Sequence, residues 1–358
     1  MAAAVDPTYP LYPIACILSA IMLLLVFLTS FIRRNWNLGV ALLCFWLFWE
    51  NLTYGINAII WSDNTDIKLY IYCDIVSHMQ LITSVVKPMA TLIITRRLYL
   101  ITSLRSVEVP DKTAVCAVGP FCKSFSSSEL LVCALKAAQD YIVQGVRFDV
   151  HEGFGCGNNP NDSLLGILLI FSWTVAPPLL SITIYYPRLI RIFYRQKRDM
   201  NEFLQSNNSV SRVNYFRIFA LASIDVFLTL PIGIVTIVLQ ATQVLAVLGK
   251  FPLYAGWTIL HTDWEPVGIS YAELLADGTS TIAQNYFTLW TSPVLAFVIF
   301  GLFGVTTEAR ASYWRAICTV GGWFGWKPTL RTRKARSPIG TMEFGERPQD
   351  MSYNLDIE

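Results

Sequence analysis

The stretch PIACILSAIMLLLVFLTSFI, residues 13–32, decides the fold class of this chain. It contains no charged side chain and is followed at once by Arg33 and Arg34. A helix needs roughly 20 mostly apolar residues to cross the hydrocarbon core of a bilayer. The stretch therefore predicts a membrane-spanning helix, with a pair of positive charges where the helix leaves the membrane.

The rest of the chain continues this pattern. Hydrophobic residues make up 54% of the 358 residues and charged residues 15%, whereas soluble domains carry about 25% charged residues. The net charge of +2 gives no basic footprint for nucleic acid. Five further apolar stretches are predicted to span the bilayer: Leu38–Ile60, Leu69–Thr95, Leu164–Tyr186, Tyr215–Leu239 and Tyr286–Val305.

Lysine and arginine gather at alternate ends of these spans, which predicts their sidedness. They follow the first and third spans, lie between the fifth and sixth, and recur after the last one. Cytoplasmic loops carry such an excess. The alternation requires one more crossing between Arg97 and Arg147, and the only candidate is the stretch 129–145. Lys136 and Asp140 interrupt it, and each charge at a helix centre costs about 2.5 to 3.5 kcal/mol on insertion.

The sequence thus predicts an all-α membrane protein, a bundle of seven transmembrane helices with its N-terminus outside and its C-terminus cytoplasmic. Residues 1–12 form a short extracellular N-terminus, residues 13–305 form the bundle, and residues 306–358 form a cytoplasmic tail. Trp314, Trp323 and Trp326 mix with basic residues early in the tail, a pattern typical of an amphipathic segment that lies in the membrane interface.

No motif for catalysis or for a cofactor is visible. The eight cysteines and three histidines have neither the CxxC nor the HExxH spacing of metal sites, and no nucleophile stands at a recognisable distance from a base. We therefore expect no enzyme activity, metal or cofactor. The rival class is a seven-span small-solute transporter or intramembrane enzyme. Transporters often show inverted repeats, and the sequence shows none.

Two cysteines, Cys73 and Cys156, are predicted to lie on the outer, oxidising side. We expect them to form a disulfide that holds the second outer loop over the bundle, with two free thiols as the alternative. The sequon that begins at Asn161 is predicted to lie outside and is a candidate for glycosylation.

Two charges fall inside predicted spans. Glu50 lies twelve residues in from Leu38, and Lys87 lies nine residues before Arg96. A rise of about 1.5 Å per residue puts both at similar depth, so an intramembrane ion pair is expected. The alternative is a protonated Glu50 and a Lys87 side chain that reaches the headgroups.

Several blocks resemble a known family. They include YGINAIIW at residues 54–61, RRLY at 96–99, YIVQGVRFDV at 141–150 and DVFLTLPIG at 225–233. In this order they resemble the fungal mating-pheromone receptors of the a-factor-receptor type, which are seven-span G-protein-coupled receptors. The chain departs from the family between Asp111 and Asp140, where members have a fully apolar fourth helix.

The resemblance implies a plasma-membrane receptor for a short peptide whose C-terminal cysteine is farnesylated and carboxymethylated. We expect the peptide to meet the acidic outer loops and the lipid to enter between helices. Membrane lipid is a further partner, and a homodimer is left open. The candidate ligand-binding residues are Asp74, His78, Tyr141, Gln144, Arg147, Asp149 and Trp173.

The resemblance also implies a heterotrimeric G protein on the cytoplasmic side. Its candidate contacts are Arg96, Arg97, Arg188, Arg191, Arg195 and Arg198, although these residues also serve to set topology and to touch anionic lipid. Asp225, Pro231 and Pro293 are candidates for a conformational switch, because proline removes a backbone hydrogen bond and commonly kinks a helix. A static kink is the alternative.

Overall fold

The computed structural model describes residues 5–32, 38–105, 139–161, 163–199, 209–262, 264–276, 278–306, 309–315 and 318. The chain divides into two compact units, residues 1–313 and residues 314–358. The second unit, which holds most of the predicted tail, is described only at residues 314, 315 and 318.

Long helices begin and end close to the predicted spans. They are α1 (Leu11–Ile32), α2 (Leu38–Ile60), α3 (Tyr70–Arg105), α10 (Ser209–Leu248) and α13 (Thr279–Ile299). Helices α3, α10 and α13 extend beyond the predicted stretches, α10 by continuing from Leu239 to Leu248. An interrupted helix fills the range of the fifth predicted span and is made of α7 (Leu164–Gly166), η1 (Ile167–Phe171), α8 (Ser172–Leu180), η2 (Ser181–Tyr185) and α9 (Tyr186–Asp199).

Among the described residues, five helical stretches are long and apolar enough to cross a membrane: Leu11–Thr29, Gly39–Ile60, Leu164–Tyr194, Phe216–Ala246 and Thr279–Gly304. The described part is therefore that of a helical membrane protein. The more highly charged α3, with 36 residues, is not among the five. Most of the predicted fourth span, residues 129–138, lies outside the described residues. The total of seven spans and the side of the membrane on which each loop lies therefore stay predictions.

The interrupted helix contains two π-helical segments, η1 and η2, which flank Pro177 and Pro178 in α8. A third, η3 (Phe300–Gly304), follows α13. Proline has no N–H to donate, so each of the two prolines interrupts the hydrogen bonding of the helix. The π segments on either side have wider hydrogen-bond spacing and occur mostly as single turns within α-helices. The helix continues past both prolines without ending.

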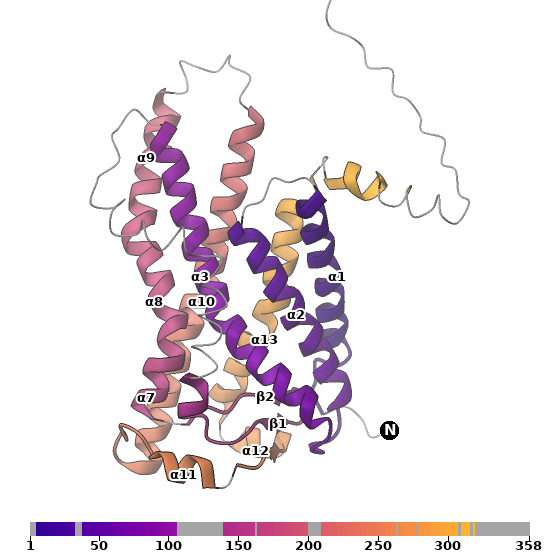
Figure 1. Cartoon of the computed structure of the whole chain (residues 1–358), viewed down its shortest axis with the longest axis vertical. Coiled ribbons are helices and arrows are strands. Elements are labelled where there is room, and N and C mark those ends of the chain that lie inside the picture. Colours follow the sequence, from indigo (N-terminus) through magenta and orange to yellow (C-terminus); the bar gives the residue numbers. More distant parts are fainter. Residues whose placement is uncertain are drawn as a thin grey trace, which may run out of the picture. The chain divides into compact units, whose positions relative to one another are not determined.

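The helices pack side by side around a common core. Helix α1 packs on α2, α2 on α3, α3 on α8 and α10, and α13 on both α10 and α1, as Figure 1 shows. Because apolar side chains meet from these helices, the largest core cluster contains fully buried residues from α1, α2, α3, α10 and α13, among them Leu23, Leu43, Leu47, Ile94, Leu221 and Leu295.

A small sheet lies at one end of the bundle. It has the order β2-β1-β3, with β1 (Asp149–His151) antiparallel to β2 (Gly155–Gly157) and parallel to β3 (Val267–Ile269). Two short helices, α11 (Trp257–Thr262) and α12 (Tyr271–Ala276), flank β3 in the chain. Figure 1 shows these elements together at the bottom of the view, which we call the sheet end.

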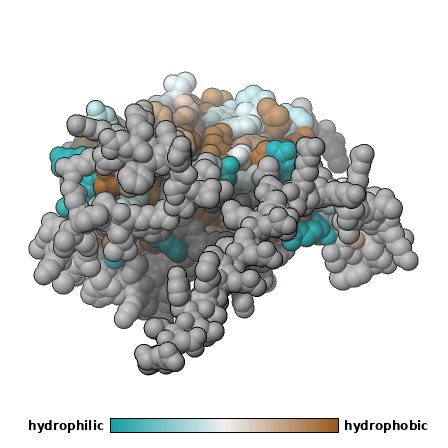
Figure 2. All heavy atoms as spheres, turned by 90° about the horizontal axis from the view of Figure 1, so that it is seen from above, coloured by the Kyte–Doolittle hydropathy of each residue, from teal (hydrophilic) through white to brown (hydrophobic). Residues whose placement is uncertain are grey.

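The opposite end, where α9 ends and α10 begins, is called the α9 end (Figure 1). Figure 2 views the molecule from this side, and hydrophilic and apolar residues of the described part both reach its surface. The sheet end is thus built from strands, loops and two short helices, whereas the described part of the α9 end is built from long helices.

Candidate functional site

A disulfide between Cys73 at the start of α3 and Cys156 in β2 fastens the sheet to the bundle. The carbonyl oxygen of Cys156 accepts hydrogen bonds from Asn57 Nδ2 (3.1 Å) and Gln80 Nε2 (3.2 Å). Gly155 has φ +85°, and a Cβ at this position would lie 2.4 Å from the Cβ of Asn57. Only glycine therefore lets the strand approach α2 this closely.

A bidentate ion pair forms a second tie at the sheet end. Arg147 donates from Nε to Asp74 Oδ1 (2.9 Å) and from Nη2 to Asp74 Oδ2 (2.5 Å). The hydrogen bond and charge of Asp74 raise the pKa of Arg147, whose guanidinium is charged at working pH in any case. The side chain of Asp74 is 30% exposed and that of Arg147 is 41% exposed. Water therefore screens the pair, which limits its strength.

The N-terminal segment is held against the same end by Asp6. Its carboxylate accepts hydrogen bonds from Thr8 Oγ1 (2.7 Å) and from Tyr286 Oη of α13 (2.7 Å). The turn between β1 and β2 is held in a similar way, since Gly153 N donates to Trp61 O at 2.7 Å. Segments distant in the sequence thus converge over the sheet end.

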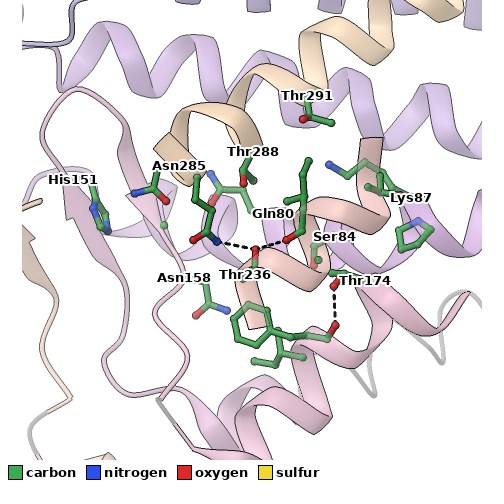
Figure 3. Close-up of a pocket in the computed structure, with 18 of the residues that line it drawn as sticks. Gln80, Ser84, Lys87, His151, Asn158, Thr174, Thr236, Asn285, Thr288 and Thr291 are labelled. Atoms are coloured by element: carbon green, nitrogen blue, oxygen red, sulfur yellow. Dashed lines mark hydrogen bonds between the residues drawn. The ribbon is translucent and has the colours of Figure 1, made fainter. Parts of the chain in front are cut away.

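Beneath the sheet lies a cavity of about 410 Å³. Its walls come from α3, from η1 and α8, from α10 and from α13, and residues 149–158 of the sheet region contribute to one end. Figure 3 shows His151 and Asn158 near this outer end of the cavity, and Lys87 and Thr291 near the opposite, inner end. The volume falls in the range of small-ligand pockets.

Most residues around the cavity carry a polar or charged side chain, although apolar atoms make up the larger part of its surface. Of the 19 lining residues, 13 carry a polar or charged side chain: Gln80, Ser84, Lys87, Asp149, His151, Asn158, Thr174, Thr229, Thr236, Gln284, Asn285, Thr288 and Thr291. Some are paired, as in the bond from Gln284 Nε2 to Thr236 Oγ1 (2.7 Å; Figure 3). Several of the hydroxyl groups donate to carbonyl oxygens of their own helices, as Thr229 Oγ1 does to Asp225 O (2.9 Å). The cavity therefore suits a ligand that has both polar and apolar groups.

Two acceptor oxygens at the outer end are buried without a hydrogen-bond partner among the described residues, Asp149 Oδ1 and Asn158 Oδ1. The other carboxylate oxygen of Asp149 lies 2.8 Å from His151 Nε2. A buried acceptor that lacks a donor is costly, but both oxygens have almost no accessible surface, so a ligand in the cavity does not reach them.

The inner end of the cavity adjoins a buried charged cluster. Lys87 Nζ donates to Glu50 Oε1 (2.8 Å) and Oε2 (3.0 Å). Glu50 also accepts from Ser292 Oγ of α13 (2.8 Å), and the Ser292 hydroxyl in turn accepts from Asn51 Nδ2 (2.9 Å). Helices α2, α3 and α13 are thereby joined through one carboxylate, in the arrangement expected for the intramembrane ion pair.

A second buried carboxylate joins α10 to α3. Asp225 is fully buried and accepts a hydrogen bond from Thr91 Oγ1. Pro231 lies six residues further along α10, and Pro293 lies inside α13 next to Ser292. Asp225 and Pro293 are buried, whereas Pro231 is exposed on the surface of α10, and the role of the three as a switch stays a prediction.

The α9 end is held by apolar and aromatic packing. Leu98 and Tyr99 of α3 form a buried cluster with Tyr185 of η2 and Leu189 of α9, and the guanidinium of Arg188 lies 5.8 Å from the centre of the Tyr99 ring. The other predicted G-protein contacts are Arg96 and Arg97 in α3 and Arg191, Arg195 and Arg198 in α9. The side chains of Arg195 and Arg198 lie outside the described part.

Of the seven predicted ligand residues, only Asp149 lines the cavity. Asp74 and Arg147 pair with each other, His78 Nδ1 lies 2.7 Å from Asp74 O, and Gln144 is buried with Nε2 2.5 Å from Arg147 O. Tyr141 packs against the rings of Trp257, His261 and Trp264. Trp173 lies in α8. The structure does not bring the seven together, and their role in binding stays a prediction.

The sequon at Asn161 adjoins this region. Asn161 N donates to Val143 O (2.7 Å), and Ser163 caps α7 through its hydroxyl. Glycosylation of Asn161 also stays a prediction. No cluster of three metal-ligating side chains occurs among the residues that were described.

Sequence reasoning missed most of the lining, although a signal for it was present. Gln80, Ser84 and Lys87 recur at intervals of four and three residues in α3, and Gln284, Thr288 and Thr291 recur in the same way in α13. Such spacing puts side chains on one face of a helix. A polar stripe inside an apolar helix thus marks a face turned towards a cavity rather than lipid.

Comparison with known proteins agrees with this architecture. The pheromone A receptor family matches residues 11–321. The pheromone B alpha 3 receptor of Schizophyllum commune is 29% identical over 97% of this chain and 54% of its own length. Pheromone receptor 1 of Mycosarcoma maydis is 25% identical, covering 78% of this chain and 76% of that receptor.

The pheromone a factor receptor of Saccharomyces cerevisiae is 22% identical over 77% of this chain and 55% of that protein. The chain spans about half the length of the Schizophyllum commune receptors that it matches. The family match covers most of the sequence, including every long helix described above. The chain therefore belongs to the pheromone A receptor family, a family of receptors and not of enzymes.

Proposed function

We propose that the chain is a seven-span receptor of the plasma membrane, with its N-terminus outside. It binds a farnesylated peptide pheromone at the sheet end and activates a heterotrimeric G protein at the α9 end. The observation that carries this proposal is the cavity beneath the sheet, whose inner end adjoins the Glu50 cluster that joins α2, α3 and α13. A ligand in this cavity touches helices that continue to the α9 end.

The ligand acts by shifting an equilibrium between two arrangements of the helices. It can do so only by its difference in affinity for the two arrangements. Helices α3, α10 and α13 each contribute to the cavity wall and to the core, so a change in their spacing at the cavity alters the contacts further along the same helices. No covalent step is required.

The decisive experiment measures G-protein activation in membranes of cells that express the chain. A panel of short peptides with a farnesylated, methyl-esterified C-terminal cysteine is compared with the same peptides without lipid. We expect activation by a lipidated peptide and at least a tenfold weaker response to its plain form. Equal potency of the two forms would remove the lipid from the proposal. No response to any peptide, together with measurable solute flux, would favour a transporter.

The proposed sidedness has its own test. The sequon at Asn161 is proposed to lie outside and the sequon at Asn207 in the cytoplasm. Replacing each asparagine by glutamine and treating the protein with a glycosidase shows which sequon carries glycan. Modification of Asn207 alone would invert the proposed topology.

A further inference from the structure

The ammonium group of Lys87 has one N–H that the protein does not use. A lysine ammonium has three N–H donors, and two of them are directed at the two oxygens of Glu50. The structure records no other hydrogen bond from this group to a described residue. The side chain is 15% exposed, against 3% for Glu50, and Lys87 is part of the cavity lining. The third N–H is thus available at the inner end of the cavity.

The charges around Lys87 define what this N–H can bind. Glu50 neutralises the ammonium, and Lys87 is the only lysine or arginine in the described lining. Asp225 is a second buried carboxylate that interacts electrostatically with Lys87. A ligand carboxylate at this place would add a further negative charge beside Glu50 and Asp225 and would have no cation of its own. A ligand ammonium would meet Lys87 with the same sign. A neutral carbonyl oxygen accepts the N–H with neither penalty.

The rest of the lining has the complementary property. Between the sheet and Lys87 the cavity is lined by side chains with acceptor oxygens, such as Ser84 and Asn285. A bound molecule therefore matches the cavity when it presents N–H groups to these oxygens and a carbonyl oxygen to Lys87. A peptide chain carries both kinds of group on its backbone.

From these observations we propose that Lys87 donates its third N–H to a carbonyl oxygen of the bound peptide, at the inner end of the cavity. Lys87 then senses the ligand, because the same ammonium holds Glu50 and, through it, Ser292 of α13. The inference rests on the proposed function, since it concerns how the pheromone is held, and it assigns a specificity-determining residue to that site.

The test compares two variants that both carry Glu50→Gln. Glu50→Gln keeps the Lys87 donor and removes the carboxylate charge, whereas Glu50→Gln combined with Lys87→Met removes the donor without leaving a buried charge unpaired. The probe is the farnesylated peptide methyl ester that gives the strongest G-protein response in the parent. A hydrogen bond from a charged donor contributes about 1.5 to 3 kcal/mol. We therefore expect Kd to rise about 10- to 100-fold from the single to the double variant.

A third variant, Glu50→Gln with Lys87→Gln, restores an N–H donor and is expected to recover part of the affinity. Equal affinity of the single and double variants, with both proteins monodisperse in detergent, would overturn the role of Lys87 and leave the proposed function standing. A parent protein to which no peptide binds would instead overturn the proposed function, and the inference with it.

A measurement on the parent protein avoids the variants altogether. Acylation of lysines by a small amine-reactive reagent is followed by mass spectrometry with and without saturating probe. Bound probe should slow the labelling of Lys87 at least several-fold and leave Lys68 unchanged, because Lys68 is exposed and lies outside the cavity lining. Unchanged labelling of Lys87 would contradict the inference even if the variants failed to fold.

Discussion

The two ends of the bundle are held together by different kinds of interaction. Segments far apart in the sequence are joined at the sheet end by a disulfide, by the backbone pairing of a three-stranded sheet and by an ion pair. At the α9 end, the described contacts are mainly apolar and aromatic, with the cluster of Leu98, Tyr99, Tyr185 and Leu189 as the example. A covalent bond and a strand register each allow one arrangement, whereas apolar side chains can repack against new neighbours. We therefore expect the α9 end to rearrange more readily than the sheet end.

The largest expected effect tests the covalent tie. Replacing Cys73 by serine should lower the free energy of unfolding by about 2 to 5 kcal/mol, the usual loss for a native disulfide. Chemical denaturation in detergent measures it. The double variant Cys73→Ser, Cys156→Ser is the control and should lose the same amount, since the same bond is absent. A clearly larger loss in the single variant would mean that the remaining thiol, not the missing bond, is responsible.

The next effect concerns the close approach of β2 to α2. Gly155→Ala places a methyl group 2.4 Å from the Cβ of Asn57 at a position with φ +85°, so we expect a loss of at least about 1 to 3 kcal/mol. Gly249→Ala is the matched control, because Gly249 also has positive φ (+64°) but has open space around it. Similar losses in both would show that backbone strain alone, and not the contact with α2, matters.

At the α9 end a change of similar size should be tolerated. Leu189 is fully buried in the apolar cluster, and Leu189→Met conserves its volume, so the expected loss is below about 1.5 kcal/mol. The same denaturation experiment measures it. Leu189→Asn, which is also of similar size but polar, serves as the contrast. A loss for the methionine variant as large as that for Gly155→Ala would break the distinction between the two ends.

A smaller effect is expected for the ion pair of the sheet end. Asp74→Asn removes the charge that faces Arg147 and keeps the shape of the side chain. Because both residues are partly exposed, the variant should melt only slightly below the parent. The difference should also shrink as salt is added, since salt screens exposed charges. A difference that persists in molar salt would indicate that hydrogen-bond geometry, rather than charge, holds Arg147.

The smallest effect is local and depends on pH. Glu273 accepts hydrogen bonds from Ser270 N (2.7 Å) and Ser270 Oγ (2.9 Å) at the start of α12, and these bonds lower the pKa of Glu273 below its usual 4.5. A carboxyl with a lowered pKa stabilises the folded state above its unfolded pKa, and this contribution is lost as pH falls through the folded pKa.

We therefore expect the amides of α12 to lose protection from hydrogen exchange below about pH 4.5, in keeping with the usual range for glutamate. Glu273→Gln, which does not titrate, is the control and corrects for the intrinsic pH dependence of exchange. Equal pH profiles for the two proteins would show that the carboxylate of Glu273 does not stabilise α12.

The helices could be predicted from the sequence because an apolar run of sufficient length has only one solution in a bilayer. Leu38–Ile60 was predicted with its observed bounds. Glu50 and Lys87 could be paired by depth alone, since the rise per residue fixes the position of a side chain along a helix. The rise per residue does not give the rotation of a helix about its own axis. It therefore cannot say which faces of the helices enclose a cavity.

The sheet end was not predictable in this way. Val267–Ile269 and Asp149–His151 are separated by more than 100 residues, and each strand has only three residues, too few for a periodic pattern. Their pairing depends on backbone hydrogen bonds, which every sequence can make. Of the seven residues expected to meet the ligand, the structure turns Asp74 and Arg147 towards each other, because opposite charges on neighbouring segments satisfy one another first.

The π segments η1 and η2 of the interrupted helix affect how α9 should be studied. Each π turn holds about one residue more than an α turn, so η1 and η2 each rotate the following residues by roughly 100° relative to a regular helix. A helical wheel drawn continuously from Leu164 would therefore assign Arg188 and Arg191 to the wrong side by more than half a turn. A cysteine or alanine scan of this stretch should be interpreted in three separate phases, which restart after Phe171 and after Tyr185.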